Sequence, residues 1–198
     1  MIGSLTRSSL ANKKQYRSLL AGNEPVSYGA YELITSTVLS SSAATVTFSS
    51  IPQTYKHLEI RMVTSDTNSA NRWLSGISLG FNSDTAANYA YHYLEGSGGS
   101  VTASGGINGT DILLRNVTTG TFTAGIHGAA VASILDYSNT SKNTTVRYLG
   151  GCYANSENGI FFGSGHWRNT NAITSLSIVG TFTAFTTTSR FSLYGIRG

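Results

Sequence analysis

The side chains that could do chemistry are scattered along this chain rather than gathered in one motif. They are nine carboxylates together with His57, His92, His127, His166 and Cys152. An active site needs a nucleophile, a base and an orienting group that converge, and neither a P-loop nor a paired-carboxylate signature can be placed in this sequence. We therefore expect that the protein is not an enzyme and that it holds no cofactor.

The sequence pattern closest to a metal site is His92 and Glu95 in "HYLE", which have the H-x-x-E spacing. On a strand, residues three apart point to opposite faces, so these two side chains would not ligate one ion. The glycine-rich "GSGGS" at 96–100 lacks the lysine and the following helix that phosphate binding uses. We expect no metal site.

Five aromatic residues could instead form a binding face. They are Tyr89, Tyr91 and Tyr93, which share one face of a predicted strand, with Trp73 and Trp167 elsewhere. Exposed rings could stack on sugars, but the same rings could pack in the core or against a neighbouring protomer, each with large contact area and a polar group at the rim. We favour the core or interface interpretation and keep the glycan face as the alternative. His92, on the opposite face of that strand, is expected to be a core histidine.

Short strands separated by polar turns position these residues. In "KHLEIRMVTS", Leu58, Ile60 and Met62 alternate with polar residues, which predicts one core-facing and one solvent-facing side. The predicted strands are 31–39, 44–48, 56–65, 74–81, 89–95, 110–115, 126–136, 143–153, 159–167, 173–182 and 189–196. With no long amphipathic helix, they indicate an all-β fold of two packed antiparallel sheets, a jelly-roll-like β-sandwich, with a closed barrel as the alternative.

Three local expectations accompany this fold. The terminal strand at 189–196 has apolar residues on both faces, so we expect it deep in a sheet. Residues 96–109 contain six glycines, and we expect a flexible surface loop there. Cys152, the only cysteine, excludes an intrachain disulfide and is expected to be a small buried strand residue.

Charge divides the 198-residue chain into an N-terminal basic arm, 1–30, and a β-sandwich domain, 31–198. The arm has a net charge of +3, whereas the domain, with nine basic and eight acidic residues, has +1. We expect a partner to order the arm, and a solvated tail is the alternative. The arm residues expected to bind that partner are Arg7, Leu10, Lys13, Lys14, Tyr16 and Arg17. We expect no nucleic-acid partner, because no aromatic pattern interleaves these cations. We expect no membrane partner, because no segment has the apolar length of a membrane helix.

Segments of the domain also point to a family. They are "VTFSSIPQTYKHLEIR", "LGFNSDTAANYAYHYLEGSG", "ILDYSNTSKNTTVRYLGGCYAN", "GIFFGSGHWRNTNAITSLSIVG" and "TTTSRFSLYGIRG". In this order they resemble a widespread group of tailed-bacteriophage virion structural proteins, over roughly residues 31 to 198. The resemblance implies a non-enzymatic structural role.

The short arm suggests where on the virion such a protein would sit. We expect a homotrimeric decoration or cement protein, made in the host cytoplasm, whose arms bind the major capsid protein or other virion proteins on the capsid exterior. The alternative is a tail fibre, tail-tip or vertex protein that contacts the host surface, with carbohydrate binding as one means.

Overall fold

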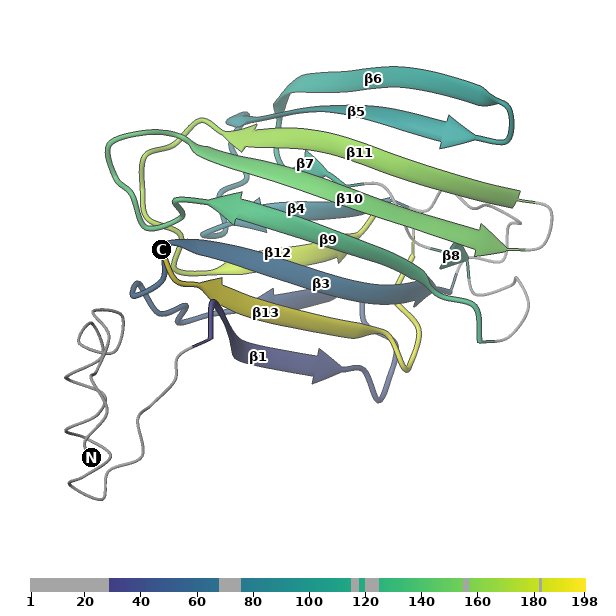
Figure 1. The fold of residues 1–198 in the computed structure, drawn as a ribbon, viewed down its shortest axis with the longest axis horizontal. Coiled ribbons are helices and arrows are strands. Elements are labelled where there is room, and N and C mark those ends of the chain that lie inside the picture. Colours follow the sequence, from purple (N-terminus) through teal and green to yellow (C-terminus); the bar gives the residue numbers. More distant parts are fainter. Residues whose placement is uncertain (1–28, 68–75, 115–117, 120–124, 155–156, 182) are drawn as a thin grey trace, which may run out of the picture.

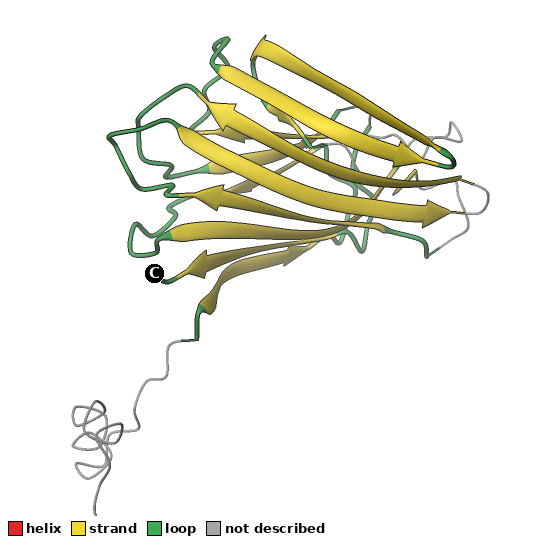
Figure 2. Ribbon diagram, turned by 45° about the horizontal axis from the view of Figure 1, so that its top comes forward, coloured by secondary structure: helices red, strands yellow, loops and turns green. Residues whose placement is uncertain are grey.

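The computed structural model describes residues 29–67, 76–114, 118–119, 125–154, 157–181 and 183–198. Within them the chain forms strands and loops but no helix, and the strands make two sheets that lie one behind the other (Figures 1 and 2). The expected β-sandwich is confirmed. The arm residues Arg7, Leu10, Lys13, Lys14, Tyr16 and Arg17, and also Trp73, lie outside the described residues.

The large sheet forms the front layer in Figure 1. Its strands, in spatial order, are β1 (Tyr31–Val38), β13 (Arg190–Ile196), β3 (His57–Asp66), β9 (Gly128–Leu135), β10 (Thr144–Ala154), β11 (Glu157–Trp167), β5 (Tyr89–Ser97) and β6 (Ser100–Gly109). All neighbours along this path are antiparallel. A short strand, β8 (Thr118–Thr119), pairs in parallel with the end of β3.

The small sheet lies behind it (Figure 1) and consists of β2 (Thr45–Phe48), β12 (Leu176–Gly180), β4 (Ile77–Phe81) and β7 (Ile112–Leu113), in spatial order. Eight strands divide equally between the sheets: β1, β3, β9 and β13 belong to the large one, and β2, β4, β7 and β12 to the small one, where β4 and β7 pair with each other. The hairpins β5–β6 and β10–β11 are extra, and both widen the large sheet. The large sheet is therefore twice as wide as β1, β3, β9 and β13 alone would make it.

Apolar side chains from both sheets fill the space between them. The inward face of β3 carries Leu58, Ile60 and Met62, all buried as the period-two pattern predicts. They pack in one cluster with small-sheet residues that include Val46, Phe48, Ile77, Leu79, Phe81, Leu176 and Ile178. Each fully buried side chain of this kind contributes roughly 1.5–3 kcal/mol relative to exposure, so the core stabilises both sheets together.

Each of the eleven predicted strand ranges contains a strand within the described residues. The terminal strand, β13, lies between β1 and β3, and Phe191 and Leu193 are fully buried on its inward side. On its outward side Ser192 is also buried, with its hydroxyl 2.8 Å from that of Ser36. The expectation that this strand is covered on both faces is therefore met at its centre.

The glycine-rich segment 96–109 corrects one expectation, because it is a hairpin rather than a loop. Ser97 pairs with Ser100 around a tight turn, and β6 runs back along β5. Two of its glycines are required by close approach: a Cβ at Gly105 would lie 2.6 Å from the carbonyl oxygen of Tyr91, and one at Gly106 would lie 2.9 Å from the ring of Tyr91. Here glycine is needed because a neighbouring strand and ring come close. A high glycine content by itself does not distinguish this role from that of a flexible loop.

A second correction concerns Cys152, which is half-buried near the end of β10 rather than buried.

Among the described residues there is no helix of the length and apolarity that a bilayer crossing requires.

Candidate functional site

The aromatic residues proposed as a binding face lie mostly in the core. Tyr89 and Trp167 are fully buried and Tyr93 is nearly so, while Tyr91 is half-buried and stacks on Tyr93 with 6.4 Å between ring centroids. Tyr89, Tyr93 and Trp167 are therefore core residues. They form neither an exposed glycan face nor an exposed interface. The expectation that His92 is a core histidine is wrong. Because the tyrosines point inward, the His92 side chain is exposed on the outer face of β5.

A buried corner explains why Trp167 and Tyr89 point inward. The indole Nε1 of Trp167 donates to Oδ2 of Asp84 at 2.7 Å, and the backbone N–H of Phe81 donates to the hydroxyl of Tyr89 at 3.0 Å. The rings of Trp167 and Tyr89 stack with centroids 6.2 Å apart. Burial raises the pKa of Tyr89 to about 12, and bonds from Asn88, Ala86 and Trp167 lower the pKa of Asp84. These groups stabilise the fold and are not arranged for a ligand.

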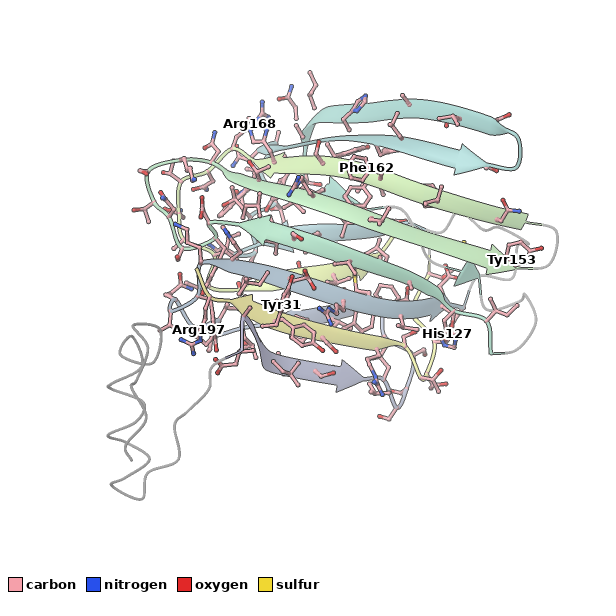
Figure 3. The ribbon with its side chains drawn as sticks, in the orientation of Figure 1. Tyr31, His127, Tyr153, Phe162, Arg168 and Arg197 are labelled. Carbon is pink, nitrogen blue, oxygen red and sulfur yellow. The ribbon has the colours of Figure 1, made fainter. Side chains whose placement is uncertain are left out.

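The outer face of the large sheet carries the largest unexplained feature. Cross-strand register places four apolar residues in one row across the middle strands, namely Val131 of β9, Leu149 of β10, Phe162 of β11 and Leu94 of β5. All four are exposed. We call them the apolar row, and Figure 3 labels Phe162 on β11. Directly paired residues share a face and lie about 4.5–5.5 Å apart, so the row is continuous.

Further exposed apolar residues flank the row toward one end of the sheet. They are Val63 of β3, Tyr153 of β10, Ile160 of β11 and Val101 of β6. Between them the small residues Ala129 and Gly151 leave a shallow groove, which Val63, Tyr153 and Ile160 also line. We call the row and these four residues together the apolar face. It offers a mostly apolar, slightly hollowed surface.

Ionic groups on the outer face of the large sheet are few and mainly positive. The Nε of Arg61 donates to Oε1 of the buried Glu59 at 2.8 Å, and its guanidinium lies over the rings of Tyr194 and Tyr31, at 4.6 and 5.3 Å from their centroids. The hydroxyl of Tyr31 also donates to Glu59, at 3.3 Å. Arg147 is exposed on β10 beside the apolar row. Arg61 is therefore paired, whereas Arg147 points outward from the middle of the sheet.

Ion pairs gather instead at the end of the sandwich where Arg197 lies (Figure 3). Arg197 donates from Nη2 to Oε2 of Glu32 at 2.5 Å, and this bond lowers the pKa of Glu32. Lys142 donates to Asp136, and that bond, with Lys56 nearby, lowers the pKa of Asp136. These pairs are largely exposed, so each adds little stability.

Polar groups elsewhere do not form a reactive cluster in the described part of the chain. His92, His166, Ser164 and Thr145 line an open hollow on the outer face of the large sheet. Within the described ranges, no group of three or more histidine, cysteine, aspartate or glutamate residues could hold a metal ion. Two imidazoles without a third ligand do not make a metal centre.

One hydrolase-like pattern also fails in context. Residues 76–80 read G-x-S-x-G, but Ser78 is buried within β4 rather than on a turn from a strand into a helix. Ser78 bonds to Asp111, whose pKa is raised by burial, and no histidine lines the small pocket that they share. This pair lacks the base that would activate a serine.

Pairs of consecutive bulky apolar residues in the sequence could have predicted the apolar face, although the alternation along single strands does not indicate it. Tyr148 and Leu149 are consecutive, as are Phe161 and Phe162, so β10 and β11 each offer bulky apolar groups to both faces. Such a strand is typical of a sheet that is covered on both sides. In this chain the inner members are buried and the outer members remain exposed.

No protein-family model, curated protein or solved structure matches this chain.

Proposed function

We propose that this chain is a non-enzymatic structural protein of a tailed-bacteriophage virion, and that it decorates and stabilises the capsid exterior. The observation that carries the proposal is the apolar face, a continuous exposed surface on the outer side of the large sheet. Large exposed apolar patches mark protein contacts. A body built in this way is suited to assembly, and the resemblance of its sequence segments directs that role to the virion.

The order of the strands supports the same proposal. We infer that the large-sheet strands β1, β13, β3 and β9 and the small-sheet strands β2, β12, β4 and β7, in these spatial orders, form a jelly roll into which two hairpins are inserted. The jelly roll is a recurrent architecture of viral capsid proteins, although it also occurs in lectins and cupins. The fold therefore agrees with a virion role and does not by itself specify one.

The arm supplies the proposed anchor. Arg7, Lys13, Lys14 and Arg17 give residues 1–30 their positive charge, and Leu10 and Tyr16 give them apolar groups to insert. The partner that fits is an acidic and polar surface of the major capsid protein. When several copies are linked, each arm raises the effective concentration of the others, so that modest individual contacts add up to firm attachment.

The alternative location is the tail, as a fibre, tail-tip or vertex protein. Three of the rings that would stack on host sugars, those of Tyr89, Tyr93 and Trp167, are buried, which is why we favour the capsid role. Copy number separates the two locations, because a decoration protein covers the shell and a tail protein does not.

The experiment is quantitative mass spectrometry of purified virions, with the major capsid protein as the internal reference. A ratio near one supports the capsid proposal. A ratio lower by an order of magnitude or more replaces it with the tail or vertex location, and absence from purified particles overturns the virion proposal.

A truncated chain tests the arm separately. Deletion of residues 1–24 should leave the body folded, as judged by circular dichroism, and should abolish binding to undecorated particles. Alanine at Arg7, Lys13, Lys14 and Arg17 is the matched variant, because it keeps the arm and removes only its cations. Full binding by the truncated protein would show that the arm is not the anchor.

A further inference from the structure

The apolar face is large enough to need a partner of its own. Its eight members are Val63, Leu94, Val101, Val131, Leu149, Tyr153, Ile160 and Phe162, each between 39% and 77% exposed. If a fully exposed side chain of this size offers on the order of 150–200 Å², together they expose on the order of 700 Å². That exceeds the largest apolar patch of a typical monomer, about 300–600 Å², and approaches the roughly 800 Å² that each partner buries in a stable interface.

We propose that a second copy of this chain covers this face, with a two-fold axis that runs along the apolar row Val131, Leu149, Phe162 and Leu94. The proposal rests on the assembly role proposed above, because it names the partner that would cover the same apolar face. Two sheets would then pack face to face, as the sheets of a sandwich do, about 10 Å apart.

The register of the sheet selects this axis over one parallel to the strands. A two-fold along the row places each row residue opposite its own counterpart, apolar against apolar. It also carries Arg147, two residues before Leu149 on β10, over Gly151, two residues after it. Gly151 lies in the groove that Tyr153 lines, so the arginine stem would fill the groove and its guanidinium would lie near the Tyr153 ring. An axis along β10 would instead oppose the two copies of Arg147.

Arg61, which continues the row on β3, does not oppose this packing. Its charge is paired with Glu59, and its guanidinium leans toward Tyr194 on β13, away from β9. The row therefore ends on β3 in a charge that is already paired, as is typical of the polar rim of a protein interface.

Charge and symmetry disfavour two other occupants. The arm, residues 1–30, carries a net charge of +3, and the described part of the outer face of the large sheet carries Arg61, Arg147 and Arg190 against one carboxylate, Glu59, which Arg61 already pairs. The cations of the arm would find no further carboxylate there, whereas the two-fold places each Arg147 over a Gly151 rather than over a like charge. A three-fold assembly needs two different complementary patches on each copy, whereas one self-complementary face is what a two-fold needs. The inference therefore departs from the trimer that the sequence suggested.

The test uses the full-length protein alone, without virions, so that its failure and the failure of the virion proposal are distinguishable. Sedimentation equilibrium should give twice the 21.0 kDa chain mass. Leu149→Lys should raise the dissociation constant at least about a hundredfold, because a charge would be buried at the centre of the interface. Leu33→Lys is the matched control: Leu33 is 54% exposed and Leu149 52%, but Leu33 lies on β1, outside the apolar face.

Opposite charges at one position test the axis. Phe162→Lys and Phe162→Glu should each be monomeric alone, and an equimolar mixture should recover the dimer, because the two-fold places position 162 opposite itself. A monomeric wild-type protein, a trimer mass, or equal dissociation by Leu33→Lys would overturn the proposal. Failure of the mixture to recover the dimer would overturn the axis.

Discussion

Replacing Asp84 with asparagine tests whether Trp167 is a structural anchor rather than a binding residue. Oδ2 of Asp84 accepts from the indole N–H of Trp167 at 2.7 Å, and Oδ1 accepts from the backbone N–H of Ala86 at 2.9 Å. Asparagine can keep only one acceptor oxygen. Oδ2 also accepts from the side-chain amide of Asn88 at 3.0 Å, so in either orientation the NH₂ group of the new asparagine faces a donor, and the loss is largest where it faces the indole N–H.

The magnitude follows from burial. Trp167 is 1% exposed, so water does not replace the lost acceptor. A buried donor left without a partner costs about 1–3 kcal/mol, so Asp84→Asn should lower the free energy of unfolding by about 2 kcal/mol. For a domain of this size, that corresponds to a fall in Tm of roughly 4–8 °C.

The assay is urea denaturation followed by tryptophan fluorescence, at neutral pH and again in acid. Bonds from Asn88, Ala86 and Trp167 lower the pKa of Asp84 from 3.8. The stabilisation is therefore present above that value and is lost as the pH falls through the lowered pKa of the folded protein. The gap between wild type and Asp84→Asn should be full at neutral pH and should narrow in strong acid.

A double-mutant cycle with Trp167→Phe supplies the control, since phenylalanine keeps a ring and removes the N–H. In that background Asp84→Asn should cost less, and the difference is the coupling energy of the two groups. The same unfolding midpoint for wild type and Asp84→Asn at neutral pH would refute the reasoning, as would a zero coupling energy.

Three further perturbations follow from the packing and the ion pairs. Gly195→Ala should lower the free energy of unfolding by about 1–3 kcal/mol through overpacking, because the new Cβ would lie 2.3 Å from the ring of the buried Tyr55. Gly99→Ala is the control: its Cβ would have nothing within 4 Å, so the urea midpoint should not change. Arg61→Ala should lower the Tm, because the buried Glu59 loses the donor that pairs its charge. Arg190→Ala, at an exposed position on the same sheet, should leave the Tm nearly unchanged. Equal losses in thermal unfolding would contradict this. Asp136→Asn should flatten the loss of stability below the ordinary aspartate pKa of 3.8, because a lysine lowers the pKa of Asp136 in the folded protein; an unchanged acid limb would count against it.

Alternation along single strands was readable from the sequence because it is local. Leu58, Ile60 and Met62 sit two residues apart, and a pleated strand sends such residues to one side whatever surrounds it. The same reasoning found strands in all eleven predicted ranges, and with them the two packed sheets. It did not decide which side of the strand at 89–97 faces inward, and so it misplaced His92.

Composition misjudged the glycine-rich segment because glycine serves two opposite purposes. It loosens an exposed loop, and it also permits the closest approach of a packed strand. Gly105 and Gly106 serve the second purpose, beside Tyr91. Only the pairing of β5 with β6 distinguishes the two, and pairing is a contact between segments rather than a property of one.

The sequence by itself determined a β-rich domain and the concentration of positive charge in residues 1–30, because periodicity, turn residues and charge are properties of the linear chain. The tertiary structure decided what the surfaces are. Trp167 became a core residue because Asp84, 83 positions away, accepts its N–H. The apolar row exists only because register aligns Val131, Leu149, Phe162 and Leu94 from four strands. A surface made of residues distant in sequence is a product of register and packing, which no single segment specifies.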